Sequence, residues 1–278
     1  MPEARKVDRK ELEQIARRLR EHIVRSTTAA GSGHPSTSLS MVELITTLYF
    51  GGVLRYDPNE PHHPDRDRFI LSKGHGAPGL YAVLAEAGYF PVDDLMTLRK
   101  LGSPLEGHPN MCRLPGVEAS TGSLGQGFSI AIGHAHAARI DGRDYRVYVM
   151  VGDGESEQGQ VWEAAMHAGN HGLDNLTLIV DRNHHQQTGA VADIQPLDPL
   201  EDKLRAFGLE VKTIDGHSLD EVAEAFDWAR SVTGRAQAIV ANTIKGKGVS
   251  LLEAEQGKWH GKPIPADEEV KALQEIGT

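Results

Sequence analysis

The chain has 278 residues, a formal net charge of -10 at pH 7 and a single cysteine, Cys112; 39% of its residues are hydrophobic and 24% are charged. A chain of this length can bury a full core without a disulfide or a metal, and the acidic balance argues against a general attraction to nucleic acid or anionic membranes. The lone cysteine excludes an intrachain disulfide, which fits a reducing compartment. The first 14 residues lack the apolar core of a signal peptide, and no apolar run could span a bilayer. We therefore expect a cytoplasmic protein with no nucleic-acid or membrane partner.

The first predicted elements are two helices joined by a turn-rich segment. Apolar residues recur at three- and four-residue steps near the start of the chain: Leu12, Ile15, Leu19 and Ile23. This spacing predicts an amphipathic surface helix that opens the domain. Further along, Ser40 and Glu43 fit a capping box at the start of a helix over 41–50. His34, in the segment GSGHPSTS, is then expected in a loop just before a helix.

Three apolar, β-branched runs follow at 145–151, 176–180 and 238–244, and they are typical of buried parallel strands. Helical patterns at 160–168 and 219–229 separate them. Strands that alternate with helices predict a doubly wound, mainly parallel α/β sheet with helices on both faces. No internal repeat or linker interrupts the pattern, so we expect one domain over 1–278. In such sheets ligands bind beyond the carboxyl ends of the strands.

Polar side chains stand where two of these runs end. Asp153 lies between Gly152 and Gly154 directly after 145–151, and Asn183 follows 176–180. Carboxylate and amide oxygens suit Mg²⁺ or Ca²⁺, and such an ion would neutralise a diphosphate that an acidic protein could not otherwise attract. In the alternative interpretation, the GDG segment is only a turn and Asn183 only a cap.

Four histidines, each next to a glycine, carry a more specific signal. They are His34 in GSGHPS, His75 in LSKGHGAPGLY, His108 in LEGHP and His260 in KWHGKPIP. A GDG followed about thirty residues later by Asn resembles the thiamine diphosphate signature, and the four histidine motifs, in this order, resemble the transketolase family. With STGSLGQG at 120–127 and TIKGKGVS at 243–250, the resemblance extends from about Leu12 to about Pro265.

The resemblance implies a set of site residues. Metal ligands would be the side chains of Asp153 and Asn183 and the backbone carbonyl of His185. Contacts to the cofactor, thiamine diphosphate, would come from His75, Gly122, Ser123, Leu124, Gly152, Asp153, Gly154, Asn183, Lys245 and His260. His34 and His260 would contact the reacting oxygens, and His75 and His108 would help to hold the diphosphate or the donor sugar. Histidine suits this work because ketol transfer moves protons near neutral pH. For Lys245, an exposed loop lysine is the alternative.

The resemblance also implies a partner. In the family, the glutamate that contacts the aminopyrimidine, an aromatic pocket and basic residues for a sugar phosphate belong to a following pyrimidine-binding domain, which these 278 residues do not contain. We therefore expect an N-terminal subunit that joins a C-terminal, pyrimidine-binding transketolase subunit in an α₂β₂ assembly. A piece of a longer enzyme is the alternative.

The expected reaction is transfer of a two-carbon ketol unit from a ketose, expected to be phosphorylated, to an aldose acceptor. Alternatives are a related thiamine diphosphate ketol or acyloin transferase of a specialised pathway, and a non-catalytic family member.

One departure from the family motif bears on the choice among these reactions. The family usually has Glu before the glycine of GDGxxxEG, whereas this chain has Gln158, with Glu157 one place earlier. Glutamine keeps a hydrogen bond but not the charge, which bears on proton sharing between active sites. The adjacent His184 and His185 are also unusual, and a role in lining the pocket and a structural role both stay open.

Overall fold

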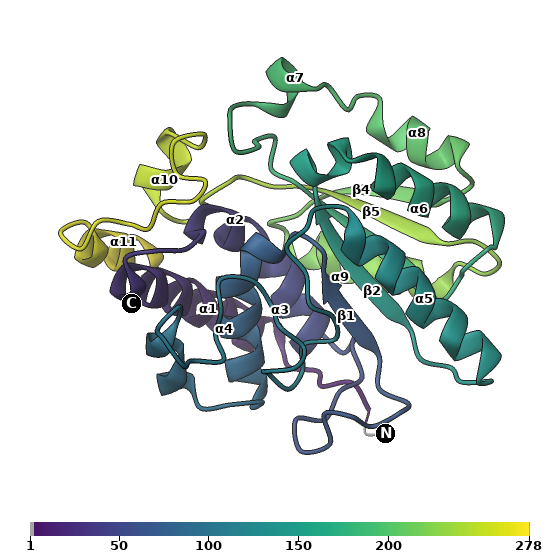
Figure 1. Cartoon of the computed structure of the whole chain (residues 1–278), viewed down its shortest axis with the longest axis horizontal. Helices are drawn as coiled ribbons and strands as arrows, with labels where there is room; N and C mark the ends of the chain where they lie inside the picture. Colours follow the sequence, from purple (N-terminus) through teal and green to yellow (C-terminus); the bar gives the residue numbers. More distant parts are fainter. Residues whose placement is uncertain (1–2, 278) are drawn as a thin grey trace.

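A computed structural model describes residues 3–277 and contains a five-stranded, fully parallel sheet with the order β1-β2-β3-β5-β4 (Figure 1). Its strands are β1 (Arg68–Leu71), β2 (Val147–Gly152), β3 (Leu176–Arg182), β4 (Glu210–Asp215) and β5 (Gln237–Asn242). The three runs expected from the sequence are β2, β3 and β5, with ends shifted by one or two residues. The expected parallel α/β fold is confirmed, and β1 and β4 are additional strands at the two edges.

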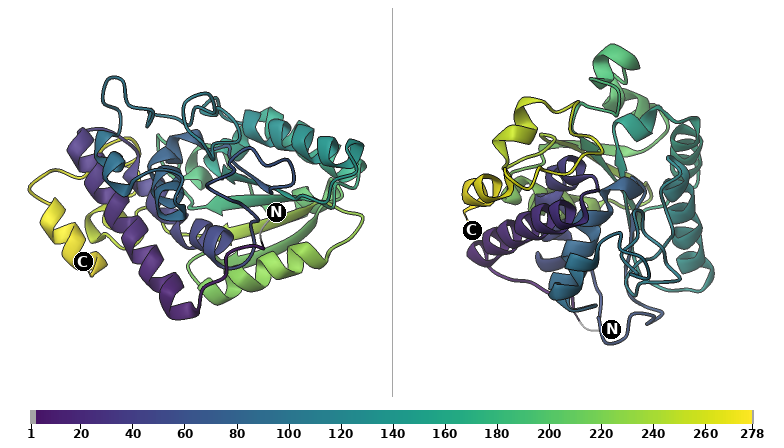
Figure 2. Two further views of the ribbon diagram at one scale, coloured as in Figure 1. Left: turned by 90° about the horizontal axis from the view of Figure 1, so that it is seen from below. Right: turned by 60° about the vertical axis from the view of Figure 1, so that its left-hand side comes forward.

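The sheet separates two apolar layers because successive strand residues point to opposite faces. Tyr148 and Met150 pack with one layer, whereas Val147, Val149 and Val151 pack with the other. The first layer contains α1 (Arg9–Ala30), α3 (Val42–Phe50), α4 (Ala77–Ala87), α9 (Leu219–Ser231), α10 (Ser250–Ala254) and α11 (Glu269–Ile276). The second contains α5 (Gln126–Ile140), α6 (Gly159–Asn170) and α8 (Leu200–Ala206), as Figure 2 shows from two further sides. The predicted helices over 160–168 and 219–229 correspond to α6 and α9.

Helix α1 confirms the predicted amphipathic helix. Asp8 caps its first turn by accepting a hydrogen bond from the Glu11 amide at 2.8 Å, and Gly31 ends it in the left-handed region at φ 58°. The predicted apolar stripe is buried, against α3, α4 and α11 among others.

The predicted capping box is wrong. A separate short helix, α2 (Pro35–Ser40), comes first, and α3 begins at Val42 after Met41. The Ser40 hydroxyl donates to buried Asp181 at 2.6 Å, and Glu43 pairs with Arg20 at 2.5 Å. Both side chains thus bind buried charged groups that are distant in the sequence, so neither caps the helix. His34 does lie directly before α2, as expected.

Short turns complete the edge of the sheet at which the strands end. The 3₁₀ turns η1 (Gly74–Gly76) and η3 (Gly154–Glu157) follow β1 and β2, and the short helix α7 (Val191–Ile194) follows β3. The 3₁₀ turn η2 (Val92–Thr97) lies instead between α4 and α5 and packs against α1 and α4. In the described part of the chain, no helix is both long enough and apolar enough to cross a membrane.

Candidate active site

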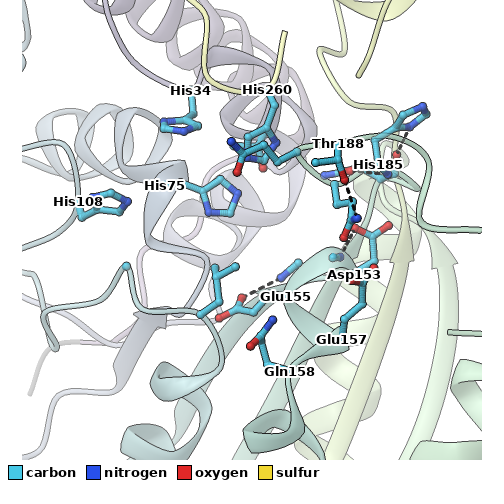
Figure 3. A pocket seen from close by; sticks show the side chains of 18 residues that line it. His34, His75, His108, Asp153, Glu155, Glu157, Gln158, His185, Thr188 and His260 are labelled. Carbon is cyan, nitrogen blue, oxygen red and sulfur yellow. Dashed lines mark hydrogen bonds between the residues drawn. The ribbon is translucent and has the colours of Figure 1, made fainter. Parts of the chain in front are cut away.

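A cavity of about 390 Å³ lies at the carboxyl edge of the sheet. Its lining comes from the start of α2, the turns after β1 and β2, the loop after β3, and the segments around His108, Gly122 and His260. Most of the predicted site residues line it together: His34, His75, His108, Gly122, Leu124, Gly152, Asp153, Gly154, Asn183, His185 and His260. Figure 3 shows the four glycine-flanked histidines on one side and Asp153, Glu157, His185 and Thr188 on the other.

The four histidines form one cluster although they are far apart in the sequence. The ring centroid of His34 lies 5.5 Å from that of His75, 6.5 Å from that of His108 and 5.4 Å from that of His260. Burial, with Arg99 next in effect, lowers the pKa of His34 to about 4, and burial together with Lys245 lowers the pKa of His260 to about 3.

The other two imidazoles follow the same trend. Burial and Lys73 bring the pKa of His75 well below its usual value, and burial and Arg99 lower the pKa of His108. All four rings are therefore neutral at pH 7, so each can donate or accept a hydrogen bond or take up a proton.

Asp153 and Asn183 lie at the ends of neighbouring strands, as predicted, because the parallel register places Gly152 opposite Asp181. The Asp153 carboxylate accepts hydrogen bonds from the amides of Gly154, at 2.8 Å, and His184. Burial, reinforced by the charge of Asp181, still raises the pKa of Asp153 to about 7. A buried carboxylate beside an amide oxygen, with so little compensation for its charge, suits a hard divalent cation.

The loop after β3 separates the adjacent histidines. The amide of His185 donates to the side-chain oxygen of Asn183 at 3.2 Å, and His185 lines the cavity. His184 adopts the left-handed region at φ 64° and lines a separate pocket beside Arg182. Of the two residues, only His185 lines the main cavity, and it borders the second pocket as well.

Lys245 is fully buried, which excludes the alternative of an exposed loop lysine. Its Nζ lies 2.9 Å from His260 Nδ1 and donates to the carbonyls of His185 and Gln186 at 3.3 and 3.4 Å. None of its hydrogen-bond partners within residues 3–277 is a carboxylate. Burial and Lys73 lower the pKa of Lys245 to about 8. A buried ammonium without a paired carboxylate fits an anionic ligand such as a diphosphate.

Two glycines allow close approach of the backbone at the cavity wall. A Cβ on Gly122, which has φ 140°, would lie 2.8 Å from the His108 ring, and a Cβ on Gly154 would lie 2.8 Å from the Gln186 Cβ. Larger residues at these positions would push side chains into or out of the cavity. Ser123, also predicted to bind the cofactor, is exposed and does not line the cavity, whereas Leu124 does.

Sequence reasoning missed three buried charges, of which Glu155 lines the cavity and the other two do not. Lys73 pairs with Asp181, and both side chains are completely buried. Glu155 accepts hydrogen bonds from the Ser72 hydroxyl at 2.6 Å and from the amides of Gly125 and Gly152 at 2.9 and 3.1 Å. This carboxylate thereby ties the TGSLGQG turn to the GDG loop. The position of Lys73 within the His75 motif was the only signal in the sequence that pointed to it.

The fold and this cavity define an α/β protein that binds its ligand at the carboxyl edge of a parallel sheet. Residues 11–278 match the family model described as "Transketolase, thiamine diphosphate binding domain". The chain is 46% identical over 243 residues to the 6-deoxy-6-sulfo-D-fructose transketolase subunit SqwG of Clostridium sp. (strain MSTE9), covering 87% of this chain and 88% of that protein. It is 42% identical over 266 residues to the transketolase of Homo sapiens, covering 95% of this chain and 42% of that one.

Solved structures agree with these matches. The crystal structure of transketolase from Campylobacter jejuni superposes with a TM-score of 0.90 at 33% identity, over 97% of this chain and 43% of that chain. The chain thus spans less than half the length of the full transketolases but most of the length of the subunit. It belongs to the transketolase family of transferases and represents the thiamine diphosphate-binding part.

Proposed function

We propose that this chain is the diphosphate-binding subunit of a two-component transketolase, which transfers a two-carbon ketol unit from a ketose to an aldose acceptor. The observation that carries the proposal is the convergence, in one cavity, of a buried carboxylate and amide for a cation with four neutral histidines, next to a buried lysine for an anion that contacts three of the lining residues. When bound, thiamine diphosphate supplies the carbanion chemistry, and protein groups bind and orient the reactants around it.

The residues would divide the work by their position. Asp153, Asn183 and the carbonyl of His185 would hold Mg²⁺ or Ca²⁺, and Lys245 would pair with the diphosphate. The His185 carbonyl accepts a hydrogen bond from Lys245 at 3.3 Å, so these two groups belong to the same end of the cavity. Gly122, Leu124, Gly152 and Gly154 would line the cofactor.

The histidines would act on the substrate. His34 and His260, whose rings are 5.4 Å apart, would contact the reacting substrate oxygens, because a neutral imidazole can both donate and accept a hydrogen bond. His75 and His108 would hold the diphosphate or the donor sugar. Lys245, at 2.9 Å from His260 Nδ1, would keep that imidazole from becoming protonated too readily.

The coverage of the relatives supports the proposal of a partner subunit. The full-length transketolases continue well beyond the part that this chain matches, and one similar protein is named as a subunit. We propose a C-terminal, pyrimidine-binding partner subunit, an assembly of two copies of each chain, and a cytoplasmic location. The donor would be a phosphorylated ketose or, by the similarity to SqwG, a sulfonated one such as 6-deoxy-6-sulfo-D-fructose.

The test combines the chain with its partner. Purification from the native source, followed by mass spectrometry, should identify a co-purifying pyrimidine-binding chain. Ketol transfer should then need both chains, a divalent cation and thiamine diphosphate, with phosphorylated and sulfonated ketoses compared as donors. Substantial turnover by the pure chain alone would refute the two-component proposal. Asp153→Ala should abolish metal-dependent cofactor binding in the complex, and unchanged cofactor affinity would refute the assigned site.

A further inference from the structure

Three histidines outside the cavity gather on the far side of the second helical layer. His136 lies near the end of α5, and His167 and His171 lie at the end of α6, one helical turn apart. One ring nitrogen from each lies within 4.8 Å of the others. His167 and His171 are exposed and His136 is half-buried. The two helices lie side by side (Figure 1).

The geometry of the cluster is close to that of a metal site. The Nε2 atoms of His136 and His167 are 2.9 Å apart, which without an ion is a hydrogen bond between one protonated and one unprotonated nitrogen. A tetrahedral ion with bonds of about 2.0–2.1 Å to imidazole holds its nitrogens roughly 3.3 Å apart. The observed separation is therefore within a small side-chain adjustment of coordination.

The third ring is placed to complete the site. The rings of His167 and His171 stack with centroids 4.1 Å apart, as residues at i and i+4 on one helix face can. The centroid of the His136 ring lies 5.2 Å from that of His167 and 5.3 Å from that of His171. The cluster thus takes one histidine from α5 and two from the end of α6, and the packing of the two helices brings the three rings together.

The surrounding charges favour a cation. The cluster lies at the carboxyl end of α6, where the helix dipole is negative. The nearest cation, Arg139, is already bound: it pairs with Asp174 at 2.8 Å and donates to the carbonyls of His171 and Gly172.

We propose that His136, His167 and His171 form a surface site for one late first-row divalent ion of the Zn²⁺ type, with water as the remaining ligand. Three imidazoles without a carboxylate suit Zn²⁺, Ni²⁺ or Cu²⁺ and disfavour Mg²⁺. The ion would clamp the far ends of α5 and α6. The near ends of these helices follow the TGSLGQG turn and the GDG loop, so the clamp would stabilise the two elements that carry the cavity walls.

The test compares zinc binding by the full chain and by the double variant His167→Gln/His171→Gln. His62→Gln is the matched control, because it removes an exposed histidine that is not in the cluster. Since the cavity histidines could also bind zinc, the readout is the difference in stoichiometry by isothermal titration. The wild type and His62→Gln should bind one more equivalent than the double variant, or bind the strongest equivalent more than about tenfold more tightly. Zinc should raise the Tm of the first two proteins more than that of the double variant.

Three further measurements make the outcome decisive. Without zinc, all three proteins should have the same Tm, because the substituted rings are exposed. The single variant His136→Gln should lose the same equivalent of zinc, and Co²⁺ bound by the wild type should give visible absorption that both cluster variants lack. Equal zinc stoichiometry and affinity in the wild type and the double variant would overturn the proposed site.

Discussion

Asp153→Asn should make the metal-free chain more stable near pH 8 while it removes a ligand of the proposed cation site. The substitution keeps the shape of the side chain and imitates the protonated carboxyl. In the wild type, burial and the nearby charge of Asp181 raise the pKa of Asp153 from its ordinary 3.8 to about 7. Because the folded-state pKa is the higher one, the contribution of this group to stability is full below pH 3.8 and is lost as the pH rises through about 7.

The size of the effect follows from the shift. A difference of about three pKa units corresponds to roughly 4 kcal/mol between the charged and neutral forms. The wild-type carboxylate accepts hydrogen bonds from the backbone amides of Gly154 and His184, one at each oxygen. Asparagine has a single side-chain oxygen, and the loss of one of these hydrogen bonds costs about 1–2 kcal/mol. We therefore expect Asp153→Asn to raise the free energy of unfolding by about 2–3 kcal/mol at pH 8 and to give no gain at pH 4, where the wild-type carboxyl is already neutral.

Urea unfolding of the two proteins in a chelator, at several pH values between 4 and 8, measures this difference directly. Other carboxylates change with pH as well, but they cancel in the comparison of wild type with variant. Addition of Mg²⁺ and thiamine diphosphate should then stabilise the wild type and not the variant. If Asp153→Asn is no more stable than the wild type at pH 8, the carboxylate is not the poorly compensated charge described above, and the argument for a cation at this position loses its physical basis.

Three further perturbations test other parts of the molecule. Burial raises the pKa of Glu86, but hydrogen bonds from His22 and Arg18 outweigh it and lower the pKa to about 2. Glu86→Gln should therefore cost about 1–3 kcal/mol at pH 7 and progressively less as the pH falls from 4.5 towards 2, measured by urea unfolding. Lys245→Met should weaken thiamine diphosphate binding by the complex about tenfold to a hundredfold in calorimetry, because a charge-assisted bond is lost, with little change in Tm. Gly122→Ala places a Cβ 2.8 Å from an imidazole at φ 140° and should cost about 1–3 kcal/mol of stability as well as cofactor affinity.

The elements that the sequence predicted are those whose local pattern matches their final environment. β2, β3 and β5 are continuous apolar runs because both faces of these strands are covered, and α1 has a clean apolar stripe because one of its faces packs on the domain. The two missed strands lack such a pattern. β1 is only four residues long, and β4, with the sequence EVKTID, lies at an edge and is only partly buried. β1 and β4 are strands because they pair with β2 and β5, and the local sequence of either segment does not reveal this pairing.

The candidate site divides in the same way. Asp153, Asn183 and the four histidines could be named in advance because each belongs to a short motif next to glycine or at the end of an apolar run. Lys73 and Asp181 could not, because a buried ion pair is identified only by the partner, which lies 108 positions away. The wrong capping box has the same origin. Ser40 has a suitable neighbour for a local bond, but buried Asp181 also needs donors, and the tertiary contact is the one that forms.

Gln158 shows how a one-residue shift in a motif moves charge within the cavity. Glutamine at this position can donate and accept hydrogen bonds but cannot release a proton, so a contact made through Gln158 transmits no charge. The acid one place earlier, Glu157, lines the same cavity and faces Gln186 in the loop after β3. In the amide orientation that satisfies both groups, the Gln186 nitrogen donates to the two Glu157 oxygens at 2.8 and 2.9 Å, and its oxygen accepts from Thr188. Burial raises the pKa of Glu157, which brings its proton exchange closer to neutrality. The carboxylate of this motif therefore faces the loop after β3 of the same chain, and residue 158, as a glutamine, cannot itself carry a proton between active sites in the proposed assembly.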